Sequence, residues 1–177
     1  MPGTLPSAGA KAPWWPVSTV KFTVLMLGTF GLYHYYWLYE NWKRMPGPGA
    51  GMSSPFWRTF FAPFTAYRLF DRVRQDAQLH VVRTPWSALG IAVAYFVANI
   101  ALVTGVPAWL ASVVLLMPVL PVQITMAKLN EAVAPDAPRN DRFTAANIVM
   151  LVLGLALTFF AYQSEQLLNQ YLEEWKP

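Results

Sequence analysis

The sequence predicts an all-α fold, a polytopic bundle of about four transmembrane helices with an amphipathic helix at the cytoplasmic-side membrane interface. Three observations lead to this prediction. Of the 177 residues, 55% are hydrophobic and 12% are charged, whereas soluble domains carry about 25% charged residues. Apolar stretches of about 20 residues, the length that crosses a bilayer core, recur along the chain. Aromatic and basic residues cluster near the ends of those stretches, as they do at membrane interfaces.

The chain begins with a proline-rich segment, residues 1–16, which we expect to be a disordered leader. It does not resemble a signal peptide, because the apolar stretch that follows is longer than a secretory hydrophobic region. Trp14 and Trp15 lie just before that stretch, where indole rings favour the headgroup layer. The transmembrane domain is then expected over 17–165, followed by a short C-terminal tail, 166–177.

The first predicted span, 17–40, is apolar at its start and strongly aromatic at its end, and Lys43 and Arg44 follow it. Gly105 and Pro107 leave only a very short turn between the second and third spans, so those two helices are expected to be antiparallel neighbours. These later spans and the fourth are predicted near 86–104, 108–127 and 145–162.

The segment 55–82 is rich in both aromatic residues and arginine, which is typical of an amphipathic helix lying at the interface or entering it shallowly. Pro55 suits its first turn and Pro63 is expected to kink it. The alternative is a fifth crossing near 56–70. On a helical wheel Phe56, Phe60, Phe64, Tyr67 and Phe70 fall on one side, and Arg58, Thr65, Arg68, Arg72 and Gln75 on another.

Lys and Arg near span ends predict the orientation, because they are retained on the cytoplasmic side. With four spans, the connection before residue 85 and the loop after residue 128 hold the dense basic segments and lie on the same side. That side is expected to be cytoplasmic, and both termini are expected on the opposite side. Lys11 and Lys21 fit this orientation less well.

The net charge of +4 arises from basic residues beside apolar stretches, so anionic lipid headgroups are the expected counter-charge. Nucleic acid is not an expected partner for this reason. The predicted headgroup-binding residues are Arg58, Arg68, Arg72, Arg74, Lys43 and Arg44.

A dense aromatic run at the end of the first span has two interpretations. It forms an aromatic belt at the cytoplasmic leaflet, or it forms a cage that binds a quaternary ammonium or lipid headgroup by cation–π contacts. The residues concerned are Tyr33, Tyr36, Trp37, Tyr39 and Trp42.

Three polar residues within predicted spans are candidates for a transport path: Lys21, Asn99 and Gln123. The alternative is that Lys21 extends to the interface and that the amides hydrogen-bond between helices. His34 and His80 lack the spacing of a metal motif, and the chain has no cysteine. We therefore expect no metal site, no cofactor and no catalytic residues.

Two motifs resemble a family of small bacterial inner-membrane proteins that is known as a domain of unknown function. The first is TFGLY at 29–33 followed by YWLYENWK at 36–43, and the second is SPFWR at 54–58. The match extends more weakly to Leu120–Gln123 and to Leu129 with Asn130. This resemblance implies a multi-pass protein of the bacterial inner (cytoplasmic) membrane, and it implies no reaction or ligand.

No hydrolase, P-loop or dinucleotide-binding motif occurs in the sequence. We therefore expect a non-enzymatic accessory, assembly or oligomeric scaffold subunit that contacts anionic lipids. It would act as a homo-oligomer or as a subunit of a membrane complex. The alternative is a small channel or carrier for an ion or small solute through the helix bundle.

Overall fold

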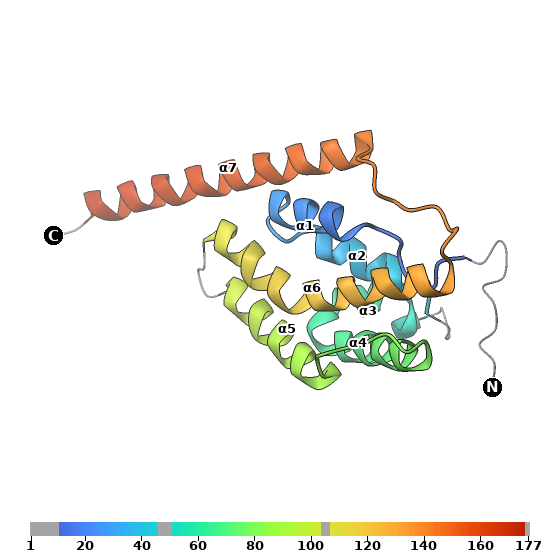
Figure 1. The fold of residues 1–177 in the computed structure, drawn as a ribbon. Helices are drawn as coiled ribbons and strands as arrows, with labels where there is room; N and C mark the ends of the chain where they lie inside the picture. The colour runs from blue at the N-terminus through green and yellow to red at the C-terminus, as the bar shows by residue number, and fades with distance from the viewer. Residues whose placement is uncertain (1–10, 46–50, 104–106, 176–177) are drawn as a thin grey trace, which may run out of the picture.

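The computed structural model describes residues 11–45, 51–103 and 107–175. Within these ranges the fold is helical, with one isolated β-bridge between Val17 and Asn140 and no β-strand (Figure 1). The predicted all-α class is therefore confirmed. The α-helices are α1 (Thr19–Gly28), α2 (Tyr33–Trp42), α3 (Pro55–Phe60), α4 (Ala62–Leu79), α5 (Ala88–Val103), α6 (Ala108–Val133) and α7 (Ala145–Glu174), and a single 3₁₀ turn, η1 (Gly51–Ser53), precedes α3.

Two helices in the described part of the chain are long and apolar enough to cross a membrane by length and composition. They are Leu110–Val133, within α6, and Ala145–Glu174, which is α7. Thr19–Gly28 and Ala88–Ile100 are apolar but shorter. Two such helices, and not four, are therefore present in the described residues.

The predicted first span is not one continuous helix. It divides into α1 and α2, which fold back on each other. The Phe22 ring of α1 lies 5.3 Å from the Trp37 ring of α2, and the backbone N–H of Trp15, just before α1, donates to Asn41 Oδ1 of α2 at 2.9 Å. The chain reverses at Phe30 and Gly31, which have positive φ angles of 51° and 88°. We call α1 and α2 together the N-terminal hairpin.

The expected amphipathic helix is also divided. Helix α3 ends at Phe60 and α4 begins at Ala62, one residue before Pro63, so the break occurs where proline is tolerated in a first turn. Phe70 does not share the exposed side with Phe56, Phe60 and Phe64, because it is buried against α5. The buried side of α4 consists instead of Ala62, Ala66, Leu69, Phe70, Val73 and Ala77.

Helix α6 lies at the centre of the packed body and contacts α1, α4 and α5. Helices α5 and α6 pack side by side, as their short connection predicts. Residues 11–16, predicted as the end of a disordered leader, instead lie against α6. The Trp14 N–H donates to Asn130 Oδ1 at 2.9 Å, and Asn130 Nδ2 donates back to the Trp14 carbonyl at 3.2 Å.

Helix α7 packs against α1 and extends well beyond the rest of the body (Figure 1). The predicted tail is helical as far as Glu174. The contact with α1 is close at Gly154, where an added Cβ would lie 2.8 Å from the Thr29 Cα. Large apolar side chains are exposed along the whole helix, from Ile148 to Leu172, and Trp175 just after its end is exposed as well.

Candidate functional site: the charged end and the aromatic groove

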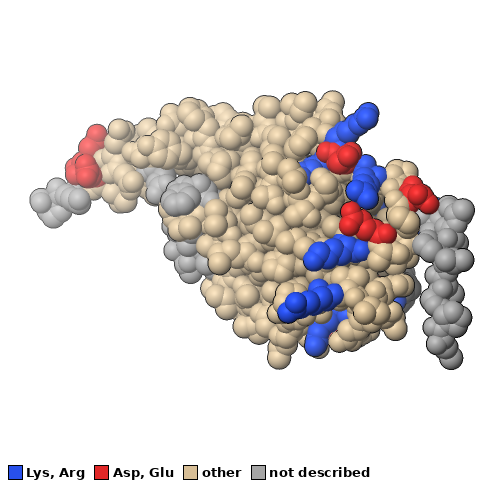
Figure 2. Space-filling view, viewed as in Figure 1, with Lys and Arg blue, Asp and Glu red and all other residues tan. Residues whose placement is uncertain are grey.

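Charged side chains gather at one end of the body, while most of the face in Figure 2 shows neither charge. The opposite end of α7 carries a separate acidic group in the same view, formed by Glu173 and Glu174. The charged end is built from residues 11–16, the last turn of α2, and the loop between α6 and α7. This end is the candidate site because it joins basic residues to the aromatic residues of α2.

A hollow of about 780 Å³ opens at the charged end, between residues 11–16, the end of α2 and residues 134–138. We call it the polar cleft. Its charged lining residues are Lys11, Lys43 and Arg44, with Glu40 and Asp136. Cations therefore outnumber carboxylates around it, which favours an anionic occupant.

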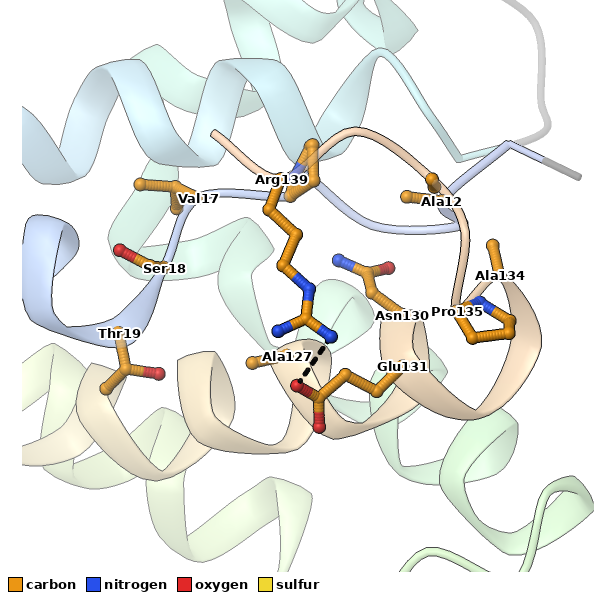
Figure 3. A pocket seen from close by; sticks show the side chains of 12 residues that line it. Ala12, Val17, Ser18, Thr19, Ala127, Asn130, Glu131, Ala134, Pro135 and Arg139 are labelled. Atoms are coloured by element: carbon orange, nitrogen blue, oxygen red, sulfur yellow. Dashed lines mark ion pairs between the residues drawn. The ribbon is translucent and has the colours of Figure 1, made fainter. Parts of the chain in front are cut away.

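A second hollow of about 180 Å³ lies beside the polar cleft, between residues 16–19 and the end of α6. Figure 3 shows Arg139 reaching across its mouth to Glu131, where the guanidinium Nη2 lies 3.4 Å from the carboxylate Oε1. Both side chains of this ion pair are more than half exposed. This ion pair therefore holds the two sides of the opening together only weakly, since exposed ion pairs contribute little free energy.

Glu40 organises the cations at the end of α2. Its carboxylate is buried and accepts hydrogen bonds from Lys43 Nζ at 3.0 Å and from Arg44 Nη1 at 3.2 Å. These pairs lie three and four residues apart, the spacings that bring helical side chains together. The hydrogen bond to Glu40 raises the pKa of Lys43 above its ordinary value. Lys43 is therefore fully protonated at neutral pH.

A third hollow, of about 420 Å³, lies between α2 and α3, and we call it the aromatic groove. Its lining is mostly apolar. Helix α2 contributes Tyr35, Tyr36 and, about one turn later, Tyr39, and α3 contributes Phe56, Thr59 and Phe60. The exposed fractions of Phe56 and Phe60 are 59% and 62%. Burial of such rings in lipid or against a ligand is favourable.

The structure separates the predicted aromatic cluster into two groups. Tyr33, Trp37 and Trp42 are buried in the core, so they are not available to a belt or a cage. Tyr36 and Tyr39 are exposed and line the aromatic groove. Tyr35, which the sequence did not single out, joins them. Its position one residue before Tyr36 and four before Tyr39 on the same helix was the available signal.

The predicted headgroup-binding arginines lie in different surroundings. The Arg58 guanidinium carbon lies 5.0 Å from the centre of the Trp42 ring. Arg68 is exposed, and Arg72 pairs with Asp76 at 3.0 Å. Arg74 is partly buried, and its Nε has no hydrogen-bond partner. Among these four side chains, Arg68 and Arg72 are therefore the most accessible to headgroups.

Lys21 is buried, with an exposed fraction of 1%. Its Nζ donates to Asn140 Oδ1 at 2.7 Å and to the Arg142 carbonyl at 2.6 Å. The lysine therefore attaches the loop between α6 and α7 to the start of α1. Neither interpretation of the sequence, a lysine at the interface or a transport residue, included this contact.

Gln123 is also fully buried. Its Oε1 accepts from the Trp37 indole N–H at 2.7 Å, and its Nε2 donates to the Val17 carbonyl at 2.7 Å. It thus joins α6 to both sides of the N-terminal hairpin. Asn99 Nδ2 donates to the carbonyl of Tyr95, one turn earlier on its own helix, at 2.8 Å.

His34 is buried, and its Nδ1 hydrogen-bonds to the carbonyl of Gly31 at the tip of the hairpin. Because a carbonyl only accepts, Nδ1 carries a proton in this contact. Nε2 has no hydrogen-bond partner. Among the described residues, no group of three or more His, Cys, Asp or Glu side chains is placed to hold a metal ion.

Comparison with models of protein families, with curated proteins and with solved structures finds no match to this chain. The resemblance of its two aromatic motifs to the uncharacterised inner-membrane family therefore stays a prediction.

Proposed function

We propose that the protein is an integral scaffold or assembly subunit of the bacterial inner membrane. In this proposal α5, α6 and α7 cross the bilayer, the N-terminal hairpin enters and leaves it on one side, and the charged end contacts anionic lipid headgroups. The observation that carries the proposal is the exposed surface of α7. This helix is of bilayer length and exposes apolar side chains all along it, and the basic residues gather at the end where it begins.

The dimensions of the helices agree with this arrangement. The apolar part of α7, residues 145–162, is about 27 Å long at about 1.5 Å per residue. A bilayer core is about 30 Å thick. Val17 lies next to the charged end, where it forms a β-bridge with Asn140, and its carbonyl also accepts a hydrogen bond from Gln123 of α6. The tip of the hairpin, at Gly31, packs against Leu115 in the first half of α6, so the hairpin runs beside α6 between Gln123 and Leu115.

A hairpin that returns to its own side changes the expected orientation. The N-terminal segment then lies with the basic connections, on the cytoplasmic side, and the end of α7 lies outside. Lys11 and Lys21, which fitted the four-span arrangement poorly, are then on the side that retains basic residues. The charge distribution therefore supports three crossings and a hairpin better than four crossings.

Single cysteines test this topology, because the chain has no cysteine of its own. We expect an impermeant maleimide added to intact cells to label Trp175→Cys, and to label Lys11→Cys and Pro138→Cys only after the membrane is opened. Labelling of Lys11→Cys from outside would mean that segment 17–40 crosses the bilayer. Release of the protein from membranes by alkaline carbonate would overturn membrane integration itself.

The role as a scaffold rests on the exposed sides of α7, which can pack against another helix in the bilayer. A channel or carrier has less support, since Gln123 and Lys21 are engaged in hydrogen bonds between elements of the fold. We expect native mass spectrometry to show a homo-oligomer or a co-purifying subunit. A monomer without partners in mild detergent would contradict the scaffold role.

A further inference from the structure

The aromatic groove and the polar cleft are both lined by residues of α2 and its C-terminal end. Tyr35, Tyr36 and Tyr39 line the groove, and Lys43, one turn after Tyr39, lines the cleft. The same helix surface therefore changes from apolar to cationic within a few residues. Each hollow by itself is open to the exterior.

One direct contact, and a second that passes through Trp15, join the two hollows. Lys43 Nζ lies 5.3 Å from the centre of the Tyr39 ring. The Arg44 guanidinium carbon lies 4.6 Å from the centre of the Trp15 ring, and that ring meets the Tyr36 ring edge-on at 6.0 Å. The cations of the cleft are thus held on aromatic rings that touch or form the groove.

We propose that the two hollows form one site for a single anionic phospholipid. An acyl chain lies in the aromatic groove, and the phosphate lies in the polar cleft near Lys43, Arg44 and Lys11. This inference rests on the proposed function, because the bilayer supplies the ligand. It goes further in assigning one bound lipid to one place, in contrast to loose contacts spread over the arginines.

The chemistry of the lining selects this class of ligand. A free phosphate would satisfy the cations but would leave Phe56 and Phe60 exposed. A neutral acyl chain would cover those rings but would leave the charge of the cleft unmatched. Glu40, which is shared between Lys43 and Arg44, and Asp136 offset two of the three positive charges, so the cleft keeps one net positive charge. A zwitterionic lipid would bring the positive charge of its own headgroup near the same cations, which disfavours it.

The test is native mass spectrometry of the purified full chain with added dioleoyl phosphatidylglycerol or dioleoyl phosphatidylcholine. We expect one phosphatidylglycerol per chain to bind about tenfold more tightly than phosphatidylcholine. Lys43→Gln and Phe60→Gln are each expected to weaken that binding about tenfold, the effect of losing one contact to a charged group or one buried ring. The matched controls are Arg83→Gln and Leu79→Gln, exposed positions outside both hollows, and both should bind as the wild type does.

Three results would overturn the inference. The first is equal binding of the two lipids, and the second is wild-type binding by both Lys43→Gln and Phe60→Gln. The third is displacement of the lipid by glycerol 3-phosphate at equal concentration, which would mean that the site binds an anion without using the aromatic groove. Thermal unfolding of each variant shows that it folds. The cysteine-labelling experiment reports separately on the membrane arrangement, so failure of the lipid site and failure of the proposed function are distinguishable.

Discussion

Gln123→Leu is the most informative single substitution in the core. Leucine removes the acceptor of the Trp37 indole N–H and the donor to the Val17 carbonyl, and both of those groups lie on buried residues. The leucine side chain is close to glutamine in size, so the change leaves little cavity. The effect therefore reports on the two hydrogen bonds that join α6 to the N-terminal hairpin.

The magnitude follows from those two bonds. Hydrogen bonds between helices in membranes contribute about 0.6 to 2 kcal/mol each, and an unpaired buried donor or acceptor costs about 1–3 kcal/mol. We expect the free energy of unfolding to fall by about 2–3 kcal/mol. For a chain of this size each kcal/mol lowers Tm by about 2–4 °C, so Tm should fall by roughly 5–10 °C.

The assay is thermal unfolding of the purified protein in mild detergent, followed by tryptophan fluorescence. The control is Gln163→Leu, because Gln163 is exposed on α7, and its Tm should stay within about 1 °C of the wild type. A Gln123→Leu protein as stable as this control would refute the assigned hydrogen bonds. Loss of solute flux without loss of stability would favour a transport role for Gln123 instead.

Three further substitutions test the hairpin, the loop and the α1–α7 contact. Lys21→Met removes both hydrogen bonds to the loop between α6 and α7, so trypsin should cut that loop faster. Its control, Lys128→Met at an exposed lysine, should not change the rate of cleavage in that loop. Gly31→Ala forces a side chain into a positive φ of 88° and should cost about 1–2 kcal/mol of unfolding free energy in a denaturant titration. Gly154→Val should clash with the backbone of α1 and lower Tm, as overpacking costs about 1–3 kcal/mol, whereas Ala161→Val on the exposed surface should not. A stable Gly154→Val protein would argue against the close crossing of α7 and α1.

The charged end could be anticipated only in part. Lys43, Arg44, Tyr36 and Tyr39 were identifiable because basic and aromatic residues at the end of an apolar stretch have few other uses. The polar cleft was not, because its other walls come from residues 11–16 and 134–138, which only the tertiary fold brings to α2. The burial of Trp37 could not be predicted either, since its indole N–H is satisfied by Gln123, which is far away in the sequence.

Composition and hydrophobic patterning by themselves determined the helical class, the apolar character and the approximate starts of α5, α6 and α7, though not the ends of α6 and α7. These features depend on local propensity and on the number of consecutive apolar residues, which a sequence states directly. The path of the chain between 17 and 45 was decided by tertiary structure. An apolar stretch of that length suits one crossing helix as well as two short helices folded back on each other, and its composition does not distinguish them. The positive φ angles at Phe30 and Gly31 and the hydrogen bonds of Gln123 select the hairpin. They can do so because long-range contacts satisfy buried polar groups on both of its sides at once.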